Sequence, residues 1–126
     1  MDLQIDIQPR ENYLHITVEG TYNLPKAKSL VINMIDAAIE HNLNRILVDH
    51  LRMDGQPILM ENFEYAVFLA TQFRKKIYAN GISGMRVAYV GRDPLGKFAE
   101  MVATNRGAVG KSLTDIDEAI AWLSAD

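Results

Sequence analysis

The sequence predicts one α/β domain, residues 1–126, built on a mainly parallel five-stranded sheet. Two observations lead to this prediction. Short apolar segments alternate along the chain with amphipathic segments of helical periodicity, and 126 residues is the usual size of one domain. Because strand, helix and next strand form a right-handed crossover, the alternation favours parallel neighbours. The expected order is ββαβαβαβα, with four helices.

The first two strands are predicted from alternating polar and apolar residues over 3–8 and again over 13–18. The short turn over 9–12 between them predicts an antiparallel hairpin. The first strand is therefore the antiparallel edge of the sheet. Further strands are expected over 45–50, 85–90 and 108–113, with a loop over 51–57.

Helices are predicted where apolar residues recur every three or four positions. Pro25 suits the first turn of a helix that runs to about Asn42, and a second helix covers roughly 59–78. Its predicted buried stripe begins at Phe63.

Two more helices follow near the end of the chain. Asp93 before Pro94 predicts the start of a third helix, which Gly107 ends. Thr114 with Asp117 three residues later predicts the cap of the last helix.

The composition excludes several classes of function. The chain has no cysteine, so disulfides, thiolate catalysis and cysteine-ligated zinc are excluded. A net charge of −3 is a poor basis for binding nucleic acid. The chain begins with no signal-peptide pattern, and no apolar run reaches the length of a membrane helix. We expect a cytoplasmic protein with no membrane span and no nucleic-acid partner.

Motifs for catalysis or cofactor binding are incomplete. Residues 110–112 resemble the end of a phosphate-binding loop, but Asn105 stands where that motif needs glycine. Residues 81–84 lack the final glycine of a nucleophile elbow. The three histidines have no metal-ligand spacing. We therefore expect no cofactor, no metal and no enzymatic activity.

The end of the central strand offers a candidate ligand site. Asp49 and His50 lie where open α/β sheets bind ligands. The helix that starts at Asp93 would present unpaired N–H groups there, and Arg92 would pair with a carboxylate or phosphate. The alternative is a hydrogen-bonded polar pair with a structural role only.

The segment 51–60 is unusually apolar for a surface loop. The candidate interface residues are Leu51, Met53, Ile58, Leu59, Met60 and, on the following helix, Phe63. Contiguous apolar area in a loop marks a binding surface, and methionine side chains adapt to a partner. The alternative is that the loop folds over the sheet edge and extends the core.

Several segments of the chain match a known family. They are 13–20 (YLHITVEG), 45–49 (RILVD), 86–91 (RVAYVG) and 113–123 (LTDIDEAIAWL). With them the chain resembles the SpoIIAA-like branch of the STAS (sulphate transporter and anti-sigma-factor antagonist) superfamily. The last segment is similar to that branch's TD-x-x-x-A-x-x-WL ending. The branch is also similar in fold to CRAL-TRIO lipid-transfer domains.

The resemblance implies a fold and a kind of function, but the family's switch is missing. Relatives carry a phosphorylatable serine just after the third strand, where phosphate resets partner affinity. The matching stretch 48–55 contains no serine, threonine or tyrosine, and the next hydroxyl-bearing residue is Tyr65. Partner switching by phosphorylation at this place is therefore not expected.

We expect a non-enzymatic STAS-like interaction module that forms a homodimer or binds a protein partner through the 51–60 loop. The alternative is a binder of a small hydrophobic or anionic ligand, as the likeness to CRAL-TRIO domains implies, at the carboxyl ends of the strands. A third alternative is an enzyme that uses Asp49, His50 and Asp54, for which the sequence identifies no substrate.

Overall fold

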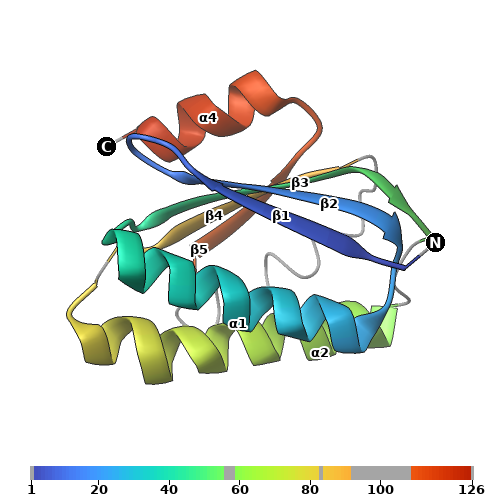
Figure 1. The fold of residues 1–126 in the computed structure, drawn as a ribbon, viewed down its shortest axis with the longest axis horizontal. Helices are drawn as coiled ribbons and strands as arrows, with labels where there is room; N and C mark the ends of the chain where they lie inside the picture. The colour runs from blue at the N-terminus through green and yellow to red at the C-terminus, as the bar shows by residue number, and fades with distance from the viewer. Residues whose placement is uncertain (1, 56–58, 83, 92–108, 126) are drawn as a thin grey trace.

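The computed structural model describes residues 2–55, 59–82, 84–91 and 109–125 (Figure 1). Its elements are β1 (Gln4–Pro9), β2 (Leu14–Thr21), α1 (Leu24–His41), β3 (Arg45–Asp54), α2 (Leu59–Gln72), the π turn η1 (Phe73–Ile77), the 3₁₀ turn η2 (Tyr78–Asn80), β4 (Arg86–Val90), β5 (Val109–Leu113) and α4 (Ile116–Ser124).

The strands form one sheet whose spatial order is the order of the chain, β1-β2-β3-β4-β5. β1 pairs with β2 antiparallel, and the other three neighbouring pairs are parallel. The predicted α/β class and the antiparallel first strand are confirmed. Because the sheet grows by one strand in one direction, right-handed crossovers place successive helices on the same face.

The sheet separates two layers of helix, with α1 and α2 on one face and α4 on the other (Figure 1). Each face has its own core, and neighbouring residues of β3 belong to different cores. Ile46 and Val48 pack toward α1 and α2, whereas Leu47 packs with Ala119 and Leu123 of α4. This alternation explains why the centre of β3 is apolar at every position.

α1 begins and ends close to the predicted positions, and both of its ends are capped. Asn23 Oδ1 accepts the backbone N–H of Lys26 at 3.0 Å, and Pro25 occupies the first turn. Asn42 ends the helix in the left-handed conformation, with φ of 52°.

The cap of α4 differs by one residue from the prediction. Asp115 Oδ1, and not the side chain of Thr114, accepts the N–H of Glu118 at 3.0 Å. An N-cap side chain accepts the N–H of the second or third helical residue, and Asp115 is therefore the cap of α4.

The helix count also differs, because the described residues contain three α-helices where the sequence predicts four. The expected helix from Asp93 to Gly107 lies outside the described residues. The second helix is shorter than expected, since regular α-helical hydrogen bonding ends at Gln72 and a π turn follows. Phe63, predicted to begin the buried stripe of this helix, is 41% exposed.

Candidate functional site

β3 extends further than the sequence predicts, through the first half of the apolar segment. Residues 51–54 are strand and not loop, and they pair with β2 as far as the contact of Thr21 with Asp54. The register shifts between the pairs Thr17–Asp49 and Glu19–Arg52, which places one extra residue in β3. This β-bulge interrupts the regular alternation, and therefore the period-two pattern ends early in the sequence.

The bulge is stabilised from within β3 and decides where the apolar side chains go. Asp49 Oδ1 accepts the backbone N–H of Leu51 at 3.1 Å. Leu51 is half-buried in the core under α4, whereas Met53 is half-buried in the core under α1 and α2. Leu51 and Met53 thus lie on opposite faces of the sheet and do not share one surface.

The other candidate interface residues lie at or before the start of α2. Ile58 is outside the described residues, and the side chains of Leu59 and Met60 in the first turn are not described. Phe63 presents 41% of its surface to solvent.

Of the three candidate ligand residues, the structure describes Asp49 and His50. The carboxylate of Asp49 is engaged at the bulge. The ring of His50 lies on the opposite face, edge-on to Tyr89 with 6.3 Å between ring centroids. Arg92 is outside the described residues. Among the residues that the structure describes, no three His, Asp or Glu gather as metal ligands would.

A group of tyrosines that the sequence reasoning missed lies at this end of the sheet. Tyr89 on β4 and Tyr65 on α2 are joined by a hydrogen bond of 2.7 Å between their hydroxyl oxygens. Their rings meet at 78° with centroids 6.0 Å apart. Burial raises the pKa of both phenols well above the ordinary value. Both therefore stay protonated hydrogen-bond donors.

His50 also belongs to this group, because its ring packs against the backbone of Gly91, which has no side chain. A Cβ atom built at Gly91 would lie 2.1 Å from the Cε1 atom of the imidazole. Only glycine at this position leaves room for the ring. Gly91 directly follows β4, and its N–H donates to the carbonyl of Leu113 at 3.1 Å, so the backbone cannot easily retreat.

Tyr22, which directly follows β2, adds a third buried hydroxyl. Its oxygen has no hydrogen-bond partner in the structure. Burial, with a further contribution from the carboxylates of Glu61 and Glu64 on α2, raises the pKa of Tyr22 to about 12. Tyr22 also lies close enough to Tyr65 to contribute electrostatically to that residue's raised pKa.

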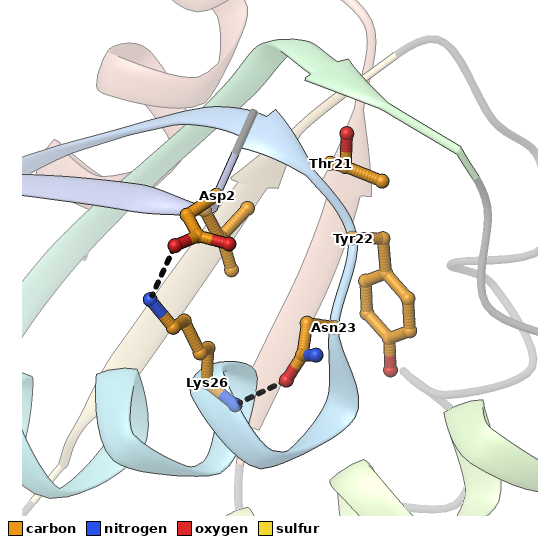
Figure 2. A pocket seen from close by; sticks show the side chains of 6 residues that line it. Asp2, Thr21, Tyr22, Asn23 and Lys26 are labelled. Carbon is orange, nitrogen blue, oxygen red and sulfur yellow. Dashed lines mark hydrogen bonds and ion pairs between the residues drawn. The ribbon is translucent and has the colours of Figure 1, made fainter.

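Beside Tyr22 lies a shallow pocket of 270 Å³ (Figure 2). It is lined by Asp2, Leu3, Thr21, Tyr22, Asn23 and Lys26. Three of its polar side chains already have partners, since Asn23 caps α1 and Lys26 Nζ lies 3.9 Å from Asp2 Oδ2. In Figure 2 the hydroxyl of Tyr22 points away from Asp2 and Lys26. The hydroxyl of Tyr22 therefore takes no part in the polar contacts of this pocket.

The sequence contained one usable signal for this group. Tyr89 occupies a core-facing position in β4, between the buried Val87 and the close-packed Gly91. A tyrosine at such a position needs a partner for its hydroxyl. The partner on α2 and the third hydroxyl, just after β2, are distant in sequence, and only the fold brings them near.

Comparisons with known proteins bear on the fold. No family model matches the chain, and a search of curated proteins finds no match. Among solved structures, an anti-sigma factor antagonist from Mycobacterium paratuberculosis matches with a TM-score of 0.61 and 12% identity, over 98% of this chain and 96% of that one. An uncharacterised DUF3478-family protein with a SpoIIAA-like fold, from Shewanella loihica PV-4, matches with a TM-score of 0.55 and 20% identity, over 96% and 93%.

The chain has a SpoIIAA-like fold. The resemblance predicted from four sequence segments is confirmed at this level. Identities of 12% and 20% show a shared fold alone. In the part of the chain that the structure describes, no helix is long and apolar enough to cross a membrane.

Proposed function

We propose that this chain is a cytoplasmic, non-enzymatic STAS-like interaction module that acts as one domain. The observation that carries the proposal is the end-to-end structural match, over 98% and 96% of the two chains, to an anti-sigma factor antagonist. A protein of that name acts on another protein. Our chain would likewise work by contact with a protein surface.

This module would bind without the phosphorylation switch that the family resemblance implies for relatives. The stretch 48–55 has no serine, threonine or tyrosine. Residues 48–54 are strand residues of β3. Binding would therefore depend on shape and apolar contact rather than on the charge of a phosphate at this place.

The proposed contact surface is narrower than the apolar segment itself. Leu51 and Met53 are half-buried in separate cores, and therefore their first role is packing. Among the described residues near this segment, Phe63 on α2 is a large apolar side chain with substantial exposure, at 41%. Interfaces are enriched in exposed aromatic residues of this kind. We place Phe63 at the centre of a homodimer interface.

The test is the mass of the native protein in solution. We expect a dimer for the unmodified chain by native mass spectrometry and sedimentation velocity, and a monomer for Phe63→Glu, because a buried charge opposes association. Val109→Glu is the matched control, since Val109 is similarly exposed at 44% but lies on the edge strand β5.

Two results would contradict this assignment. The first is a monomer for the unmodified chain at high micromolar concentration, which rules out the homodimer. The second is equal dissociation by Phe63→Glu and Val109→Glu, which would mean that α2 is not the interface.

A further inference from the structure

Three tyrosine hydroxyls near one end of the sheet hold more hydrogen-bond donors than the structure satisfies. Each phenol has one O–H group. One O–H is used in the bond of 2.7 Å between Tyr65 and Tyr89, and no described group accepts the other O–H of that pair. The buried hydroxyl of Tyr22 has no partner either. Two donors therefore remain without acceptors.

Unsatisfied buried donors are rare in folded proteins, and they call for an explanation such as an acceptor from outside the chain. The position supports this explanation. Tyr22 directly follows β2, Tyr89 lies near the end of β4 before Gly91, and His50 lies beyond the middle of β3. These are the carboxyl ends of parallel strands, where open α/β sheets bind ligands. His50 packs here at the edge of Tyr89.

The core on this face of the sheet is apolar. Met53 of β3 and Val67 and Phe68 of α2 pack in the same half-buried layer as Tyr65 and Tyr89. An occupant that uses the donors must therefore combine an acceptor oxygen with an apolar body.

The charges of the described residues near Tyr22 disfavour an anionic acceptor. The carboxylates of Glu61 and Glu64 both act electrostatically on Tyr22 and raise its pKa. The ammonium group of Lys28, which lies 3.4 Å from Glu64, is already paired with that carboxylate. A negatively charged ligand beside Tyr22 would be repelled, whereas a neutral carbonyl would not.

We propose that Tyr22, Tyr65 and Tyr89, with His50 at their edge, form a binding site for a small neutral molecule that carries a carbonyl oxygen on an apolar body. The site lies between α2 and the sheet and is separate from the exposed position of Phe63. The test of this site is therefore independent of the test of the homodimer interface.

The experiment uses the full chain, labelled with carbon-13 in its tyrosine rings and titrated with three matched probes. Acetophenone offers a neutral carbonyl, ethylbenzene has a similar shape without an acceptor, and benzoate carries a carboxylate. We expect acetophenone to shift the ring signals of Tyr22, Tyr65 and Tyr89. Ethylbenzene and benzoate should bind at least about fivefold more weakly, which corresponds to the loss of one neutral hydrogen bond.

Two variants assign the effect to the hydroxyl. Tyr22→Phe keeps the ring and should weaken acetophenone about fivefold while leaving ethylbenzene unchanged. Tyr13→Phe is the control, because Tyr13 packs in the core under α4, on the other face of the sheet. It should change neither probe. The same spectra report whether each variant is folded.

The proposal is wrong if acetophenone and ethylbenzene bind equally, or if benzoate binds most tightly. It is also wrong if acetophenone leaves the three tyrosine signals unmoved at millimolar concentration, because solvent alone would then serve the donors.

Discussion

At the scale of single residues, the hydroxyl of Tyr22 is a buried polar group that lacks a hydrogen-bond partner. Removing it while keeping the ring eliminates a desolvated donor. We expect Tyr22→Phe to leave the free energy of unfolding unchanged or to raise it by up to about 1 kcal/mol. Tyr89→Phe removes the bond to Tyr65 and should lower it by about 1 kcal/mol. Urea denaturation of both variants measures the contrast. A clear loss of stability in Tyr22→Phe would mean that its hydroxyl has a partner.

A second prediction at this scale concerns the effect of a side chain at Gly91 on stability. A methyl group at this position would overlap the His50 imidazole, with 2.1 Å between Cβ and Cε1. Gly91→Ala should therefore lower the free energy of unfolding by about 1–3 kcal/mol, as overpacking does. Adding His50→Ala removes the obstacle and should restore part of the loss relative to His50→Ala alone. Strictly additive effects in denaturation would show that this contact does not constrain the backbone.

At the scale of elements, two arginines hold the carboxyl end of α4 against the sheet. Arg45 Nε donates to the carbonyl of Leu123 at 2.8 Å, and Arg86 donates to the carbonyls of Trp122 and Ala125 at 3.0 and 2.8 Å. These bonds satisfy carbonyls at or beyond the last turn. The positive charges interact favourably with the negative, carboxyl end of the helix dipole. Burial, together with the nearby charge of Arg86, lowers the pKa of Arg45.

We expect Arg86→Gln to loosen α4 and to lower the free energy of unfolding by about 1–2 kcal/mol. Faster amide hydrogen exchange should be confined to this helix. Lys111→Gln is the matched control, since Lys111 also lies over the Trp122 ring, at 6.0 Å, but is not the donor to these carbonyls. Equal effects of the two variants would mean that charge alone, without hydrogen bonding, holds the helix.

Elements with regular periodicity could be predicted from the sequence, and irregular ones could not. The hairpin, the apolar centre of β3 and the Asn42 end of α1 follow from local patterns, and the structure confirms them. The bulge after Asp49 depends on pairing with β2, which no local pattern records, and so the strand at 51–54 was mistaken for a loop. The tyrosine group depends on contacts between three distant elements, and only Asp49 and His50 were named near it.

At the scale of the whole molecule, the buried phenols make the stability of the folded state depend on pH. Tyr22 has a folded pKa of about 12 against an ordinary value of 10.0, and the pKa values of Tyr65 and Tyr89 are raised by burial as well. Their protonated forms are favoured in the folded state, so their contribution to stability is complete below pH 10. It falls as pH rises from 10 through the folded pKa values, because the unfolded chain loses these protons first.

Tyrosinate absorbance in an alkaline titration measures this coupling directly. Of the five tyrosines in the chain, Tyr22, Tyr65 and Tyr89 should resist ionisation near pH 10 and then ionise together as the sheet and α2 separate. Circular dichroism should lose its helical signal in the same pH interval. Tyr65→Phe should make that transition shallower, since fewer protons are released on unfolding. Ionisation of all five tyrosines near pH 10 while the circular dichroism stays native would show that these phenols are open to solvent. Such a result would contradict both the role of the buried tyrosines in stability and the proposed binding site.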